Sequence, residues 1–194
     1  MKNTKEKLLE NATLMFAEHG FDGVSTRSLV TMSMVNLCTI NYYFGSKQKL
    51  YNAVIDGIMN NVKENLIKKI DEYINQDIPI MNKIILGVEV FFDYLFSDNV
   101  SNAMAMILFR ELLNNTPGGD RIYSEIMEPL KKRFVNLIVD ATDMNKQEAY
   151  INAQCLVSQA ISFRLLQNRK HYSREFLKQA KQQIVENCKK MLCD

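Results

Sequence analysis

The chain has 194 residues and a formal net charge of only +2, and its 47% hydrophobic and 24% charged residues are typical of a globular protein, which excludes a largely disordered chain. No apolar run approaches the roughly 20 residues of a membrane span. Acids and amides interrupt the N-terminal MKNTKEKLLENATLMF, so we expect neither a membrane segment nor a signal peptide. The four cysteines form no CxxC pair, which fits reduced thiols in a cytoplasmic protein. Residues 1–50 hold six Lys and Arg against four acids, which suits an end that faces a polyanion.

Apolar residues recur at helical spacing along the whole chain, and glycine (7 residues) and proline (3 residues) are scarce. We therefore predict an all-α fold of about nine helices. The three front helices are predicted at Thr4–His19, after a cap at Ser25, and at Leu37–Tyr43. The six longer ones are predicted from the Ser46 cap to Ile74, then at Pro79–Phe96, Ser101–Asn115, Asp120–Ala141, Lys146–Asn168, and from Ser173 to the end. The segment NNTPGGD is the strongest break in this pattern.

Two short helices joined by a tight turn and packed on a longer first helix describe a helix-turn-helix, whose second short helix enters the DNA major groove. Leu29, Val35 and Ile40 provide the apolar contacts between these helices. The polar and aromatic residues around Ile40 in NLCTINYYFGSK then remain free to touch bases and phosphates. Lys47 adds a cation at a helix start, where backbone amides also favour a phosphate. Alternatively, Tyr42 and Tyr43 are half-buried surface aromatics and Lys47 is a solvated residue at a helix start.

The sequence ENATLMFAEHGFDGVSTRSLV, with VNLCTINYYFGSKQKLYNAV after it, resembles the N-terminal domain of TetR-family transcriptional regulators. The residues at the family's spacing are Phe16, Gly20, Phe21, Leu29, Val35, Thr39, Ile40, Tyr43, Phe44, Lys47 and Leu50. The form INYYFGSK further resembles the subgroup related to regulators of cefoperazone and chloramphenicol sensitivity, as do Arg110, Glu111, Thr116, Pro117 and Gln159. The resemblance implies a helix-turn-helix DNA-binding domain at residues 1–48 and a helical domain for effector binding and dimerisation at residues 49–194.

The residues that we expect at the DNA are Thr26, Arg27, Asn36, Leu37, Cys38, Thr39, Asn41, Tyr42, Tyr43 and Lys47. Three departures from the family pattern stand among or beside them. Met34 occupies a turn position that is usually glycine, where a left-handed backbone is costly for other residues. Leu37 replaces a polar residue and suits a thymine methyl, and Cys38 replaces a small residue. These departures leave the docking mode intact but make the operator sequence unpredictable.

The run KIILGVEVFFDYLF is apolar nearly all round and predicts a buried helix, in which Glu89 and Asp93 lie four residues apart. Either these acids face solvent or pair with lysines, or they supply polar groups inside an effector pocket. Arg110 and Glu111 fit a salt-bridge or cap pair as well as an effector site. The effector-binding candidates are Glu89, Phe92, Asp93, Met106, Phe109, Arg110, Met127 and Gln159, and the expected effector is a small lipophilic or aromatic molecule.

The last two predicted helices resemble the antiparallel pair that forms a four-helix dimer interface in the family. Each carries an apolar stripe, for which ordinary core packing is the alternative explanation. The expected interface residues are Ala153, Leu156, Val157, Ala160, Ile161, Leu177 and Ile184.

An enzyme is not expected, because His19 and His171 stand in unrelated contexts without a nucleophile or metal motif. Cys188 and Cys193 are five residues apart on a predicted helix and do not converge, so we expect no thiol-based metal or redox sensor. We therefore predict no catalytic residue, no metal site and no cofactor. The expected function is that of a homodimeric, ligand-responsive repressor, which a small effector releases from a pseudo-palindromic operator. The alternative is an architectural DNA-binding factor of the same fold that has no effector.

Overall fold

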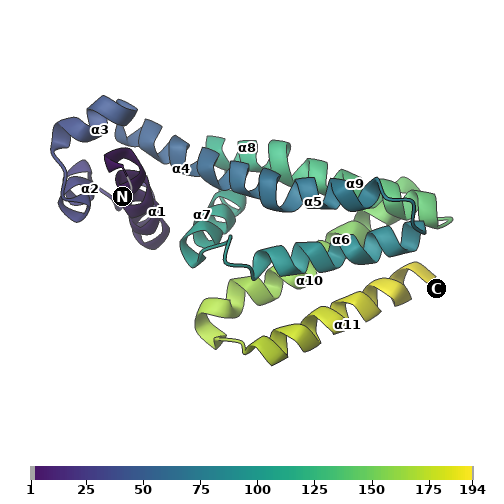
Figure 1. Ribbon diagram of the computed structural model, residues 1–194. Helices are drawn as coiled ribbons and strands as arrows, with labels where there is room; N and C mark the ends of the chain where they lie inside the picture. The colour runs from purple at the N-terminus through teal and green to yellow at the C-terminus, as the bar shows by residue number, and fades with distance from the viewer. Residues whose placement is uncertain (1–2, 194) are drawn as a thin grey trace. The chain divides into compact units, whose positions relative to one another are not determined.

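The computed structural model describes residues 3–193, and every regular element in that range is helical. The elements are, in chain order, α1 (Thr4–His19), α2 (Thr26–Ser33), α3 (Leu37–Phe44), α4 (Lys47–Val62), η1 (Lys63–Ile67), α5 (Lys68–Ile74), α6 (Ile80–Leu95), α7 (Asn102–Leu113), α8 (Pro117–Ile122), η2 (Tyr123–Met127), α9 (Glu128–Ala141), α10 (Lys146–Lys170) and α11 (Arg174–Cys193) (Figure 1). The π-helical segments η1 and η2 join their neighbours into single long helices. The described residues therefore form nine continuous helices, and the predicted all-α class is confirmed.

The helices pack into two compact units. The first unit contains the described residues up to Asn60 together with Ser101–Ile122, and the second contains Asn61–Val100 and the chain from Tyr123 onward. Packing thus groups α7 and α8 with the N-terminal helices. The boundary predicted after residue 48 concerns which residues bind DNA, and it stays a prediction.

The core of the first unit follows from the apolar spacing along α1 to α4. Leu8, Ala12 and Phe16 of α1 are fully buried, and Leu29 and Ile40 bring α2 and α3 onto them. The start of α1 is fixed by a capping box, in which Asn3 Oδ1 accepts from the Glu6 N–H at 2.9 Å and the Asn3 N–H donates to Glu6 Oε2. The predicted bounds of α1 are confirmed.

The helix predicted from Asp120 begins three residues earlier, at Pro117. Proline suits the first turn of a helix, and the two glycines after it serve close packing rather than a break. A Cβ at Gly118 would collide with a carboxylate oxygen of Glu111, and one at Gly119 would collide with the Glu111 carbonyl. At Gly119 the contact is with backbone, so a side chain does not fit, whereas at Gly118 the ends of the Glu111 and Ile55 side chains would have to move.

The second unit is a bundle built around α6, α9 and α10. The buried residues of α6 include Ile84, Val88, Phe91 and Phe92, which confirms the predicted buried helix. Helices α10 and α11 lie side by side in opposite directions (Figure 1), joined by the short connection at residues 171–173. Within the described part of the chain, no helix is both long and apolar enough to cross a membrane.

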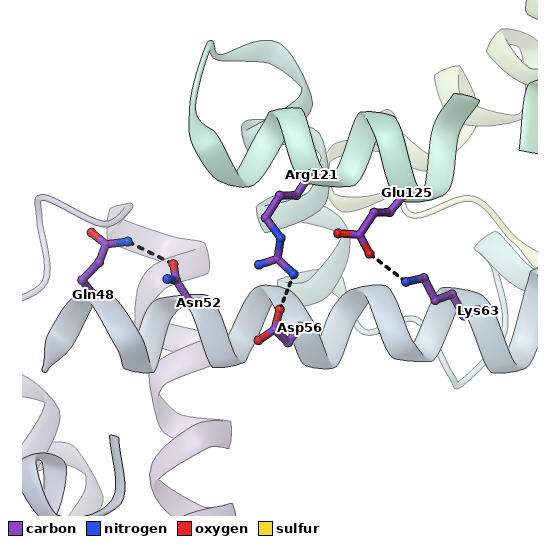
Figure 2. A network of polar contacts seen from close by, with 6 residues as sticks. All are labelled: Gln48, Asn52, Asp56, Lys63, Arg121 and Glu125. Carbon is purple, nitrogen blue, oxygen red and sulfur yellow. Dashed lines mark hydrogen bonds and ion pairs between the residues drawn. The ribbon is translucent and has the colours of Figure 1, made fainter. Parts of the chain in front are cut away.

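Polar contacts follow the long helix from α4 into η1 (Figure 2). In the first unit, Arg121 Nη2 of α8 donates to Asp56 Oδ1 of α4 at 2.7 Å. In the second, Lys63 Nζ of η1 donates to Glu125 Oε2 of η2 at 2.9 Å, so the two π-helical segments face each other. A bidentate ion pair follows within the second unit, from Arg133 Nε and Nη2 to the Asp71 carboxylate at 2.6 and 2.8 Å.

Candidate nucleic-acid interface

Local capping shapes the turn between α2 and α3. Ser25 and Ser28 form a capping box at the start of α2, and Asn36 Oδ1 caps α3 by accepting from the Cys38 N–H at 3.1 Å. Between the helices, Met34 takes the left-handed conformation (φ 54°, ψ 45°), which locates the unusual turn predicted from the sequence. Its side chain is 86% exposed, so no packing offsets the backbone cost.

Helix α3 buries one side and exposes the other. Ile40 and Phe44 pack inward, whereas Asn41 and Tyr42 face solvent, with Tyr42 82% exposed. The exposed DNA-binding candidates are Arg27, Asn36, Leu37, Cys38, Asn41, Tyr42 and Tyr43, and the partly buried ones are Thr26, Thr39 and Lys47. The structure therefore gathers the predicted residues at the helix-turn-helix and leaves most of them accessible.

The helix-turn-helix sequence carries charge of one sign. The sequence from Gly23 to Ile55 contains no aspartate or glutamate, while Arg27, Lys47 and Lys49 all lie in it. No carboxylate of these elements would repel a phosphate, because α2, α3 and the first half of α4 carry none. This distribution suits a polyanion more than the net charge of the chain does.

Lys47 has a different environment from the one predicted. Its Nζ donates to the carbonyls of Phe21 and Val24, at 2.9 Å each, and lies 4.1 Å from the centroid of the Phe21 ring. The side chain thus ties the α1–α2 connection to the start of α4. Its predicted contact with a phosphate stays a prediction, but the ammonium already has protein partners.

Arg110, an effector-binding candidate, instead holds the end of α1. Its Nη1 donates to the Phe16 carbonyl at 2.6 Å and its Nη2 to the Ala17 carbonyl at 2.8 Å. These carbonyls belong to the last turn of α1, where backbone acceptors lack partners within the helix and a cation is favourable. The cap role left open for Arg110 therefore matches the geometry, and its α1 partners carried no signal in the sequence.

Glu111 stands in a buried polar network. Its carboxylate is 5% exposed and accepts from the Tyr51 hydroxyl at 2.6 Å and from the Thr116 hydroxyl at 2.5 Å. Thr116 Oγ1 in turn accepts from the Gly119 N–H at 2.9 Å. Burial, together with the bond to Glu111, raises the pKa of Tyr51 above its ordinary value. The network connects α4, α7 and α8 inside the first unit.

Comparison with known proteins identifies both parts of the chain. Residues 8–54 match the model of bacterial regulatory proteins of the tetR family, and residues 82–191 match the C-terminal domain of the HTH-type transcriptional dual regulator CecR. The chain belongs to the TetR family. It is a transcription regulator with a CecR-type C-terminal domain, in a family of regulators rather than enzymes, as the sequence predicted.

Curated relatives and solved structures agree with this assignment. CecR of Shigella flexneri is 25% identical over 173 residues, 84% of this chain and 77% of that protein. The probable HTH-type regulator YttP of Bacillus subtilis is 24% identical over 152 residues, 77% of this chain and 68% of its own length. AibR, solved with isovaleryl coenzyme A and operator DNA, has a TM-score of 0.74 at 12% identity, covering 95% of this chain and 97% of that one. The ketosteroid regulator KstR2 of Mycobacterium tuberculosis gives 0.71 at 14% identity, covering 96% and 95%.

The effector-binding candidates of this TetR-family chain are divided between the two units. Met106, Phe109 and Arg110 lie on α7 in the first unit, whereas the other five lie in the second. Phe92 is buried in the core, and Gln159 Oε1 accepts from the Asn187 amide at 2.8 Å. Asp93 accepts from Lys181 Nζ at 2.8 Å, which is the lysine pairing left open in the sequence.

A cavity of about 330 Å³ lies in the second unit, and Asp93 is on its wall. The residues that line it are Asn65, Lys69, Glu72, Tyr73, Val90, Asp93, Tyr94, Ser97 and Asn99. Most of these side chains are polar or charged, which does not suit the lipophilic effector expected from the sequence. Asn65, Lys69 and Glu72 gave no signal, because they lie on helical faces that sequence alone marks as solvated, and Asn99 lies in the connection between α6 and α7. Among residues 3–193, no three His, Cys, Asp or Glu side chains gather as a metal ion would require.

The predicted dimer interface stays a prediction, but five of its seven residues are buried within the single chain. Ala153, Leu156, Val157, Ala160 and Ile184 are all at most 5% exposed within the single chain, so they belong to its own core. Ile161 and Leu177 are partly buried. The exposed apolar residues of these two helices are Tyr150, Ile151, Leu165, Leu166 and Phe176, between 39% and 55% exposed. The apolar surface of the hairpin is therefore on the other side of α10.

Proposed function

We propose that this TetR-family protein is a homodimeric, ligand-responsive repressor that acts in the cytoplasm and binds a pseudo-palindromic operator through α3. The observation that carries the proposal is the exposed polar face of α3, which is capped by Asn36 and stands in a stretch without acids. In a helix-turn-helix, this helix contacts base edges while the preceding helix crosses the phosphate backbone. We assign base contact to Asn41, since asparagine pairs with adenine through two hydrogen bonds, and phosphate contact to Arg27.

The experiment is footprinting and salt titration on an operator selected in vitro. Arg27→Ala should weaken binding to specific and random DNA alike and reduce the salt dependence. Asn41→Ala should change the preferred base at one position of each half-site, at a cost of about 1–3 kcal/mol. Arg169→Ala on α10 is the matched control for lost charge. Equal losses on specific and random DNA for Asn41→Ala would refute its assigned role.

The dimer should form through the exposed side of α10 and α11. Ile151, Leu165, Leu166 and Phe176 give that side an apolar surface, and a twofold protein reads two half-sites. Leu166→Asp should yield folded monomers in sedimentation experiments. Val157→Asp, on the buried side of the same helix, should instead unfold the protein because it buries a charge. A folded Leu166→Asp dimer would contradict this interface.

Repression should be relieved by a small effector that binds the C-terminal domain. AibR was solved with both isovaleryl coenzyme A and operator DNA, which shows both kinds of partner in a protein of this fold. An effector shifts the equilibrium only if it prefers the conformation with poor DNA affinity, and a coupling of about 1–3 kcal/mol is usual. Saturating operator must then weaken effector binding by the same factor, which calorimetry measures. If no small molecule shows this coupling, the architectural alternative replaces the repressor.

A further inference from the structure

The buried side of α10 changes character near its C-terminal end. Ala149, Ala153, Val157 and Ala160 pack inward at helical spacing and are all at most 5% exposed. Arg164 follows one turn later on the same side and is also 5% exposed. An arginine thus occupies the position where the pattern calls for another core residue.

Arg164 has few partners in this position. Its Nη2 donates to the Val100 carbonyl at 3.2 Å, and its Nε is buried without a hydrogen-bond partner. One turn further along α10, Gln167 Oε1 is also buried without a partner. Burial lowers the pKa of Arg164, and no carboxylate offsets that effect. A buried charge without a counter-charge is strongly unfavourable, so this arrangement requires an explanation.

The other buried polar side chains that the structure describes are satisfied. Glu111 accepts two hydroxyl bonds, and Ser33 Oγ accepts from the Asn11 amide at 3.2 Å. The ammonium of Lys131 donates to the Tyr150 hydroxyl at 2.7 Å and lies 4.5 Å from the centroid of that ring. Among the buried charged groups of residues 3–193, the Arg164 guanidinium therefore stands out by its missing partner.

The chain near Arg164 does not supply a counter-charge. The sequence from Ala149 to Arg174 contains no acid but includes Arg169 and Lys170, so the end of α10 is basic. Asp98 is the acid nearest in sequence to Val100, but it is exposed and contributes nothing to the pKa of Arg164. An anion from outside the chain would meet only positive charge on this part of α10.

We propose that Arg164 and Gln167 anchor the anionic group, a carboxylate or a phosphate, of a small ligand of the second unit. The free Nε edge of a guanidinium binds such groups through parallel hydrogen bonds, and Gln167 Oε1 would accept from a hydroxyl or amide N–H of the same ligand. The Val100 carbonyl that accepts from Arg164 belongs to the same connection as Ser97 and Asn99, which line the 330 Å³ cavity, although Arg164 itself is not among the residues of that lining. The ligand class is thus an acid or phosphate ester that carries a hydrogen-bond donor. If the ligand is the effector, the inference rests on the proposed function.

Calorimetry on the full chain without DNA tests the site directly, and hexanoate, hexyl phosphate and hexanamide are the probes. The two anions distinguish carboxylate from phosphate, and the amide has the same chain without the charge. At least one anion should bind at least about tenfold more tightly than hexanamide. Arg164→Met should weaken that anion about 10- to 100-fold and leave hexanamide unchanged. Gln167→Met should weaken hexanamide, whose N–H₂ can donate to Oε1, and leave hexanoate, which has no donor, unchanged. Arg169→Met, an exposed arginine on the same helix, is the matched control and should stay within about twofold of the wild type.

Equal binding of hexanamide and the anions would overturn the proposal. So would an equal loss in Arg164→Met and Arg169→Met, which would indicate long-range charge alone, or no binding of either anion at millimolar concentration. If Arg164→Met does not fold, Arg164→Lys keeps the charge without the planar fork and must still weaken the anion about tenfold. If Asp98→Asn alters anion binding as strongly as Arg164→Met does, Asp98 is the partner of the arginine and the proposal fails. Operator binding is measured separately, so a failed anion site leaves the DNA-binding proposal intact.

Discussion

Replacing Arg110 with methionine should loosen the C-terminal end of α1. The change keeps the apolar stem but removes the bonds from Nη1 to the Phe16 carbonyl (2.6 Å) and from Nη2 to the Ala17 carbonyl (2.8 Å). The Phe16 carbonyl keeps the Gly20 N–H at 2.9 Å, so Ala17 suffers the larger loss. An unsatisfied carbonyl costs about 1–3 kcal/mol, and because Arg110 is only partly buried we expect about 2 kcal/mol.

Hydrogen exchange measures this effect locally. A loss of about 2 kcal/mol corresponds to roughly 30-fold faster exchange of the amides in the last turn of α1 and of Gly20. Amides of α6, in the second unit, should be unchanged. Arg169→Met removes an exposed guanidinium elsewhere and should leave α1 unaffected. If the α1 amides of Arg110→Met exchange at the wild-type rate, the two hydrogen bonds do not hold this helix and the reasoning is wrong.

Three further outcomes follow from the geometry. Met34→Gly should raise the free energy of unfolding of the first unit by about 0.5–1 kcal/mol, because glycine adopts the left-handed turn without a Cβ penalty; a lower urea midpoint would contradict this. Lys47→Met should speed hydrogen exchange in the connection between α1 and α2 in the absence of DNA, because the bonds to the Phe21 and Val24 carbonyls are lost. Unchanged exchange together with weaker operator binding would indicate instead that the ammonium contacts a phosphate. Burial raises the pKa of Tyr51 and Tyr94, while an unfolded tyrosine ionises near pH 10. Their contribution to the free energy of unfolding is therefore complete below about pH 10 and is lost above it at up to about 1.4 kcal/mol per pH unit for each tyrosine. In urea titrations, a variant with phenylalanine at both positions should show a smaller fall in the free energy of unfolding above about pH 10.

Local chemistry made the helices predictable. The sequence marked Ser25 and Ser46 as residues that cap the free backbone amides at a helix start, and the apolar spacing of α1 predicted its bounds. The helix-turn-helix motif then placed the DNA-binding candidates, since exposure on α3 follows from burying Ile40 and Phe44. These features depend on neighbours within a few residues, which the sequence contains directly.

Helix α10 shows why periodicity alone could not select the dimer residues. It carries one apolar stripe through Ala153 and Val157 and another through Ile151 and Leu166. Periodicity finds both stripes but cannot tell which one faces the core of the same chain, because that depends on how α6 and α9 pack. The same limit applies to Arg164: arginine is usually exposed, so the sequence did not predict its burial. The partners of Arg110 are more than 90 residues away in the chain, beyond any local pattern.

The π-helical segments restrict how this chain can change its length. A π turn holds one residue more than a regular α-helix needs, and each residue turns a helix by about 100°. Deleting one residue of η1 would give an uninterrupted α-helix and keep the phase of α5, so Asp71 would still face Arg133. Residues 75–79, which connect α5 and α6, lie outside the helices, so a change in their number does not change which side of a helix faces the core. Insertions and deletions should therefore be tolerated between the helices, whereas inside the two long helices only the loss of one residue at a π turn keeps the same side of the helix on the core.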